Sequence, residues 1–483
     1  MTEVVAPTRW LCEHAWLGPG RVLPWVLLQV EGERISRVEA GVPPPAADAG
    51  TVAVAGAGAG VPEPEVAVAR VLRGLTLPGF GNAHSHAFHR LLRGHTQRAG
   101  GDFWHWRELM YQVAAALDPD GYHQLARAAF AEMVLAGWTA VGEFHYLHHQ
   151  PDGRPYQDPN AMGLALCAAA ADVGIRLTLL DTCYLWAGFG RRPPGSVQRR
   201  FSDGSVAAWA ARVERFHSDV QRQGGGLTRV GAAIHSVRAV APEELGEVAA
   251  WACSAGVPLH VHLSEQVAEN HDSIAYTGRR PAALLDEAGA LSPDTTAVHA
   301  THLDADDLRR LGAAGGFACL CPTTERDLGD GIGPAAELRD AGVRLCVGSD
   351  SHAVVDPFEE ARAVELDDRL RLGRRGVHDP DELLGAATAN GYAALGWEPA
   401  GLRPGGLADF VTVSLGSRRL AGAVGGEGAD LAAAVLFAAA PDDVTDVVIA
   451  GREVVRAGRH VRYDDVAGML ARAARANRAG LPG

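Results

Sequence analysis

The stretch Leu77-Pro-Gly-Phe-Gly-Asn-Ala-His-Ser-His86 ends an apolar run in two histidines that are one residue apart. Side chains at positions i and i+2 of a strand project to the same face, so His84 and His86 can offer two imidazoles to one metal ion. Imidazole suits zinc and other borderline divalent metals. Two ordinary core or surface histidines fit the same pattern, so the rest of the chain has to decide between these readings.

Three later apolar segments also end in residues that bind metals or protons. The first ends in His262, which Glu265 follows three residues later, the second in His299, and the third in Asp350. In a (β/α)8 barrel the C-terminal ends of the strands converge on one face, where the active site is built. Three histidines and a carboxylate there would make a hydrolytic metal site with an open position for water.

Eight strand-like segments follow residue 75, and helical patterns separate them. One predicted helix covers residues 121–135, and another begins at Pro242, since proline is favoured at the first helical position. This alternation predicts an α/β fold with a closed parallel (β/α)8, TIM-like barrel. A doubly wound open sheet is the alternative, but no Gly-rich dinucleotide or P-loop motif follows any predicted strand. The predicted strands are residues 76–84, 139–146, 175–183, 229–235, 257–262, 296–300, 316–321 and 343–349.

Both chain ends carry strand patterns of their own. Residues 9–40 predict antiparallel strands, and residues 406–414 and 444–451 predict two more. Residues 41–68 are rich in Ala, Gly, Val and Pro, and we expect a flexible loop there. The predicted domains are a small composite β-sandwich, residues 1–74 and 403–483, and the barrel, residues 75–402.

Composition and charge narrow the class of partner. The 483 residues are 47% hydrophobic and 21% charged, which is ordinary for a soluble globular protein. The net charge of −14 and the lack of a long basic run argue against nucleic acid and anionic membranes as partners. We see neither a membrane-spanning apolar stretch nor a signal peptide, so we expect a cytoplasmic protein.

Cysteine and lysine usage exclude several chemistries. The seven cysteines are scattered and odd in number, which predicts reduced, buried thiols. Cys319 and Cys321 form a CxC pair without a second thiolate pair, so a thiolate metal site is not expected. The chain contains no lysine, which excludes a Schiff base and a carboxylated lysine that bridges two metals.

The pattern of HxH after the first predicted barrel strand, histidine after the fifth and sixth, and aspartate after the eighth resembles the amidohydrolase superfamily. The spacing from His262 to Glu265 resembles its mononuclear deaminase branch, and the missing lysine agrees with that branch. Within the branch the chain resembles the formimidoylglutamate deiminase family over about residues 75–410. His89 departs from the glutamine of some members, and the loop at 41–68 looks longer than usual. The sequence segments that carry this resemblance are residues 84–90, 103–111, 142–149, 234–239, 262–266 and 348–352.

The resemblance implies a metal-dependent hydrolase that converts N-formimidoyl-L-glutamate into N-formyl-L-glutamate and ammonia in histidine degradation. It implies one divalent ion, with Zn²⁺ expected, although the ligand types also accept iron or manganese. The implied ligands are His84, His86, His262 and Asp350. His260 is the alternative to His262, which lies nearer the strand end and carries Glu265 at the right spacing.

Catalysis in such a site would fall to three residues. Glu265 would take a proton from water and deliver it to the leaving nitrogen. Asp350 would hold or relay a proton beside the metal, and His299 would hydrogen-bond the attacking hydroxyl.

The implied substrate carries two carboxylates, and arginine binds a carboxylate through two parallel hydrogen bonds. Arg107 and Arg238 are the candidates for this role, with help from His89, Tyr146 and His235. Two other functions stay open at this stage. A deaminase that acts on a guanine-, cytosine- or pterin-like heterocycle would need stacking rather than two arginines, and a non-catalytic barrel-shaped assembly protein would be expected to lack metal ligands. The fold family also implies a homodimer.

Overall fold

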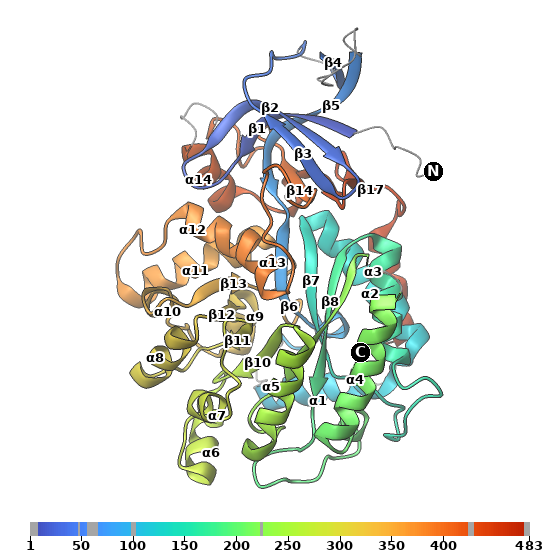
Figure 1. Cartoon of the computed structure of the whole chain (residues 1–483), viewed down its shortest axis with the longest axis vertical. Helices are drawn as coiled ribbons and strands as arrows, with labels where there is room; N and C mark the ends of the chain where they lie inside the picture. Colours follow the sequence, from blue (N-terminus) through green and yellow to red (C-terminus); the bar gives the residue numbers. More distant parts are fainter. Residues whose placement is uncertain are drawn as a thin grey trace.

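Two β-sheets organise the chain in the computed structural model, which describes residues 8–46, 49–55, 66–97, 103–222, 226–423 and 429–477. One is an eight-stranded parallel sheet that is almost closed into a barrel, and the other is a nine-stranded sheet built from both chain ends. The barrel and the end sheet occupy opposite ends of the molecule (Figure 1).

The barrel confirms the predicted fold class. Its strands neighbour one another in chain order, and a parallel bridge between Ser85 and Asp350 joins the last strand region to the first. Both faces of these strands are buried, as expected for a parallel sheet that helices cover. The strands are β6 (Phe80–Ser85), β7 (Trp138–His145), β8 (Arg176–Cys183), β9 (Thr228–Ile234), β10 (Leu259–Leu263), β11 (Thr295–His299), β12 (Phe317–Leu320) and β13 (Arg344–Val347).

Helices follow the strands and cover the barrel from outside (Figure 1). The predicted helix over residues 121–135 is α2, which Asp118 caps by accepting a hydrogen bond from the amide of Gly121. The 3₁₀ segments near the site are η1 (Ala87–Leu92) and η2 (Gln198–Phe201). The longer helices are α1 (Phe103–Ala116), α2 (Pro119–Ala136), α3 (Ala161–Val173), α4 (Val206–Arg222), α5 (Pro242–Ala255), α6 (Val267–Thr277), α8 (Ala305–Ala314), α11 (Pro357–Leu372), α14 (Ala429–Ala438) and α15 (Val466–Asn477); the shorter ones are α7 (Pro281–Glu287), α9 (Pro322–Leu328), α10 (Ala335–Asp340), α12 (Pro380–Gly385) and α13 (Gly391–Ala394).

Both chain ends contribute strands to one separate sheet, as predicted, and the structure has a single nine-stranded sheet where we expected a small β-sandwich. Its order is β17-β16-β15-β14-β5-β1-β2-β3, with β4 paired to β5, so the antiparallel pairing of β5 with β14 joins the two halves. We propose domain boundaries near residues 74 and 403, although β5 runs past the first of them. The strands are β1 (Thr8–Trp16), β2 (Val22–Glu31), β3 (Arg34–Glu39), β4 (Thr51–Ala55), β5 (Val66–Pro78), β14 (Phe410–Val413), β15 (Val444–Ile449), β16 (Arg452–Arg456) and β17 (Arg459–His460).

Two predicted segments need correction. The first predicted barrel strand, 76–84, is divided at Gly79, because β5 ends there in the end sheet and β6 begins in the barrel. A side chain at Gly79 would place Cβ 2.2 Å from Oγ1 of Thr139, so the crossing between the sheets requires glycine. The prediction of a loop over residues 41–68 is also wrong in part, because residues 51–55 form strand β4, which pairs with β5. Residues 47–48 and 56–65 of that loop lie outside the described part of the chain.

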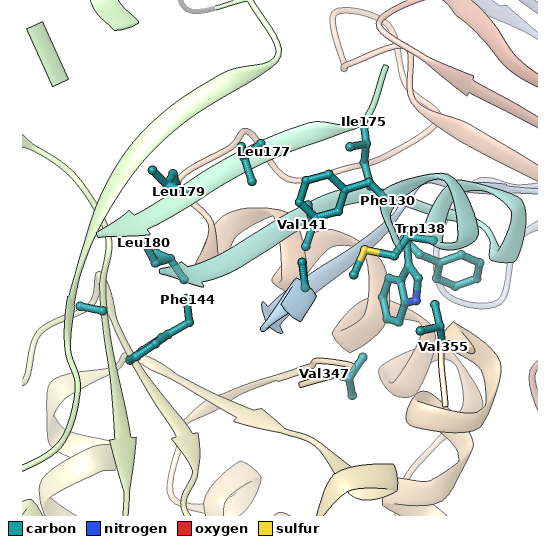
Figure 2. Packing of buried hydrophobic residues seen from close by; sticks show 14 of the residues in the cluster. Phe130, Trp138, Val141, Phe144, Ile175, Leu177, Leu179, Leu180, Val347 and Val355 are labelled. Carbon is teal, nitrogen blue, oxygen red and sulfur yellow. The ribbon is translucent and has the colours of Figure 1, made fainter. Parts of the chain in front are cut away.

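A continuous apolar core fills the space between the barrel strands and their helices. Figure 2 shows part of it, where Phe130 of α2 lies near Trp138 and Val141 of β7 and near Ile175, which precedes β8. Within the described ranges, the helices lack the combination of length and apolar character that crossing a bilayer requires.

Candidate metal centre and active site

Four side chains from three strand ends meet at the C-terminal mouth of the barrel. Nε2 of His84 lies 3.2 Å from Nε2 of His262 and 3.2 Å from Oδ1 of Asp350. Nε2 of His86 lies 3.4 Å from the same carboxylate oxygen. Four donors held by one zinc ion at about 2.0–2.1 Å in a tetrahedron are separated by about 3.3 Å, so this cluster has the size that such an ion requires.

The three histidines of the cluster are held in the neutral form, which is the form that binds a metal ion. Burial lowers the pKa of His84 and His262, and burial together with His84 lowers the pKa of His86 to about 3. Nδ1 of His86 donates to the carbonyl of Phe144 at 3.0 Å, which leaves the Nε2 lone pair to face the cluster. Neutral imidazoles and one carboxylate therefore fit a divalent ion at this position.

Residues at the site have backbone conformations that are unusual for non-glycine residues. Asp350 has a φ of +39° and His299 has a φ of +68°, in the left-handed region that only glycine adopts easily. Such strain is typical of functional sites at the ends of strands. His260 lies two residues before His262 on β10, but its Nε2 donates to the carbonyl of Ala394 at 2.8 Å. The structure thus places His262, and not His260, beside His84.

His299 lies beside three carboxylates, one of which belongs to the metal cluster. Its Nε2 lies 3.8 Å from Oε1 of Glu265 and 3.9 Å from Oδ2 of Asp350, and its Nδ1 lies 3.4 Å from Glu325. Burial acts to lower the pKa of His299, but these carboxylates outweigh it and raise the pKa to about 10. Burial also raises the pKa of Glu265, and the charge of His299 acts against this rise.

His299, Glu325 and Cys321 form another group whose potential ligand atoms lie within 4.8 Å of one another. Burial raises the pKa of the Cys321 thiol well above its usual value. A protonated thiol is a poor metal ligand, so this group does not compete with the histidine cluster.

One pocket contains every predicted substrate-binding residue. Arg107 and Arg238 line it, and Tyr146, His235 and His89 complete its wall beside the metal cluster. Nε2 of His89 lies 3.1 Å from the hydroxyl of Tyr146. The Arg107 guanidinium lies 5.7 Å from the centre of the Tyr111 ring, and the buried Nε of Arg238 has no hydrogen-bond partner. Two arginines thus line the pocket that contains the metal cluster.

Sequence reasoning missed several pocket residues. Tyr184 follows β8 directly, so the rule that strand ends carry the site could have found it. The same rule could have pointed to Glu325 of α9, which contacts His299 although it does not line the pocket. Phe201, by contrast, lies on the short η2 turn, and only the folded chain brings it to the pocket. The pocket residues that were not predicted are Trp106, Met110, Tyr111, Tyr184, Phe201 and Leu328.

Comparisons with known proteins identify the family to which the chain belongs. Residues 75–454 match the amidohydrolase family. The chain is 41% identical to formimidoylglutamate deiminase of Pseudomonas aeruginosa over 81% of this chain and 87% of the relative. It is 30% identical to 8-oxoguanine deaminase of the same organism over 83% of this chain and 86% of that protein.

Solved structures show the same architecture. An amidohydrolase from Brucella melitensis superposes with a TM-score of 0.85 and 32% identity, over 98% of this chain and 100% of that one. An adenosine deaminase from Xanthomonas campestris with bound zinc superposes with a TM-score of 0.79 and 24% identity, over 98% of both chains, which shows the shared fold. The barrel, the match across residues 75–454 and the 41% identity together establish that this chain belongs to the amidohydrolase family and is a hydrolase that acts on a carbon–nitrogen bond.

Proposed function

We propose that this protein is a metal-dependent deiminase that hydrolyses N-formimidoyl-L-glutamate to N-formyl-L-glutamate and ammonia. The observation that carries the proposal is the shared pocket, in which the histidine cluster, Glu265 and the two arginines Arg107 and Arg238 face one space. The similarity to formimidoylglutamate deiminase of Pseudomonas aeruginosa supports the same substrate.

His84, His86, His262 and Asp350 would hold the divalent ion. Their donor atoms are spaced for one ion, and burial keeps the imidazoles neutral. A bound divalent ion would lower the pKa of a coordinated water toward neutrality and so provide a nucleophile at working pH.

The proton transfers would be carried out by the chain's own residues. Glu265 would accept a proton from the attacking water and pass it to the departing nitrogen, which leaves as ammonia. His299 would donate a hydrogen bond to the incoming hydroxyl group, while Glu325 fixes its other nitrogen. Asp350 would relay a proton beside the cluster. One water is consumed, and the carbon–nitrogen double bond is replaced by the carbonyl of the formyl group.

Substrate recognition would follow from the two arginines that line the pocket. Arg107 and Arg238 would each pair with one carboxylate of the substrate, because a guanidinium matches a carboxylate in charge and in shape. Tyr146, His235 and His89 would complete the polar contacts. A guanidinium pairs with a carboxylate and a neutral heterocycle carries none, which favours the dicarboxylate.

Ammonia release tests this proposal directly. The purified, metal-loaded protein is incubated with formimidoylglutamate, 8-oxoguanine, guanine or cytosine, and ammonia is measured by a coupled dehydrogenase assay. We expect release from formimidoylglutamate alone. Release from a heterocycle without release from formimidoylglutamate would reverse the assignment.

We also propose that the ion is zinc and that the enzyme acts as a cytoplasmic homodimer in histidine degradation. All seven cysteines are unpaired, as expected in a reducing compartment. Elemental analysis of protein grown in mixed metals tests the ion, and light scattering after size exclusion tests the dimer.

A further inference from the structure

Ser85, the residue between the two histidines of the HxH motif, is the centre of a buried hydrogen-bond network. Its Oγ donates to Oε2 of Glu143 on β7 at 2.8 Å and lies 2.9 Å from Nε2 of His352. A serine hydroxyl has one proton to give, so His352 donates its Nε2 proton to Ser85. The three side chains have no exposed surface.

The carboxylate of Glu143 holds the chain on both sides of His86. Oε2 accepts from Ser85, and Oε1 accepts from the backbone amide of Ala87 at 2.6 Å and from the Tyr122 hydroxyl at 3.5 Å. A buried carboxylate is costly unless donors surround it, so these contacts fix Glu143 and the turn that follows β6 together.

His352 ties the same network to the other side of the metal cluster. It follows Asp350 by two residues and has a φ of +56°, and its carbonyl accepts from Nε of Arg93 at 2.8 Å. The backbone reinforces this link, because the amide of Asp350 donates to the carbonyl of His84 at 3.0 Å, and the amide of His86 donates to the carbonyl of Asp350 at 3.1 Å. The network thus joins the chain segments that carry three of the four proposed ligands.

We infer that Glu143, Ser85 and His352 are positioning residues that hold His84, His86 and Asp350 at the separation that receives the metal ion. None of the three lines the substrate pocket. The inference therefore rests on the proposed metal site and not on the identity of the substrate. Residues that orient metal ligands from behind are typically worth about 10- to 100-fold in metal affinity.

The test is a Zn²⁺ titration of metal-free protein against a chromophoric chelator. Ser85→Ala removes both hydrogen bonds of the hydroxyl, and we expect its zinc affinity to fall about 10- to 100-fold. Ser85→Thr, which keeps the hydroxyl, should recover most of that loss. Glu143→Gln keeps the shape but replaces one acceptor oxygen with an amino group, which cannot accept from both Ser85 and Ala87, and it should also weaken zinc binding. If Ser85→Ala does not fold, Glu143→Gln decides the question.

Thr139→Val is the matched control, because it removes a buried hydroxyl from β7, the strand that carries Glu143. That hydroxyl lies 2.9 Å from the carbonyl of Phe80 and 2.7 Å from the Tyr392 hydroxyl, away from the cluster. We expect it to lower the melting temperature of the metal-free protein about as much as Ser85→Ala while leaving zinc affinity unchanged. Equal zinc affinity in the parent, Ser85→Ala and Glu143→Gln would overturn the inference, as would an equal loss in Thr139→Val. A parent protein that binds no zinc would instead overturn the proposed metal site.

Discussion

The guanidinium of Arg176 and the carboxylate of Asp409 form a two-pronged salt bridge between the barrel and the end sheet. Nε of Arg176 donates to Oδ2 at 2.5 Å and Nη2 donates to Oδ1 at 3.1 Å, and both side chains are almost fully buried. Asp409 also accepts from the Tyr392 hydroxyl and from the amide of Ala450, each at 2.7 Å. One carboxylate thus joins strand β8, helix α13 and the turn after β15.

Asp409→Asn should therefore weaken the whole fold. Breaking a buried pair leaves the Arg176 charge uncompensated, which typically costs about 3–5 kcal/mol of the free energy of unfolding. Chemical denaturation of the variant measures this loss. Glu287→Gln removes one partner of the exposed pair with Arg279 and should cost no more than about 1 kcal/mol. Similar losses in the two variants would contradict the proposed role of the buried bridge.

Glu265→Gln should keep the metal and lose most of the turnover. Glutamine retains the shape of glutamate but cannot carry a proton, so kcat should fall by roughly 10²-fold or more. Metal content, measured on the same sample, separates a lost proton shuttle from a lost ion. Full activity would assign the shuttle elsewhere, with Asp350 as the next candidate.

Arg107→Ala and Arg238→Ala should each lower kcat/KM for formimidoylglutamate while leaving metal content unchanged. A lost charge-assisted hydrogen bond is worth about 1.5–3 kcal/mol, or roughly 10- to 150-fold. The decisive comparison uses a substrate that lacks one carboxylate, for which at least one variant should lose less. If the ratio of kcat/KM between the two substrates is the same in both variants as in the parent, neither arginine binds a carboxylate of the substrate. Arg279→Ala, in an exposed ion pair away from the pocket, is the control.

His262→Gln should lose the metal, whereas His260→Gln should keep it. The two histidines lie on the same strand, but only His262 contacts His84, while His260 donates to a backbone carbonyl. Elemental analysis should find one divalent ion per parent chain, and a strong chelator should abolish turnover until the ion is restored. Two tightly bound ions per active chain would be incompatible with this site.

His148 should make the folded protein sensitive to acid. Burial, aided by the charge of Arg212, lowers the pKa of His148 to about 4, below its value of about 6.5 in an unfolded chain. The stability it contributes is therefore complete above pH 6.5 and is lost as the pH falls toward 4. His148→Gln can still donate to the carbonyl of Thr182 and does not titrate.

The free energy of unfolding, measured for parent and variant across this pH range, checks the assignment. The difference between them should change by up to about 3 kcal/mol between pH 7 and pH 4, with the variant less dependent on pH. Parallel pH profiles would mean that His148 does not titrate in this range.

The sequence by itself determined the eight barrel strands, because apolar runs of strand length separated by helical patterns are local features of the chain. It also determined the candidate ligands, because His84, His86, His262 and Asp350 each stand at the end of such a run. Strand ends converge in any closed parallel barrel, so these residues had to become neighbours once the fold was known.

Only the tertiary structure decided the features that depend on contacts between distant segments. The division at Gly79 follows from the approach of Thr139, and the strand β4 follows from its pairing with β5. The sequence favoured His262 over His260, but the partners of each came only from the fold, because both side chains share one face of β10 and differ in what lies across the barrel. Periodicity fixes the face on which a side chain lies, whereas its partners come from other strands and helices.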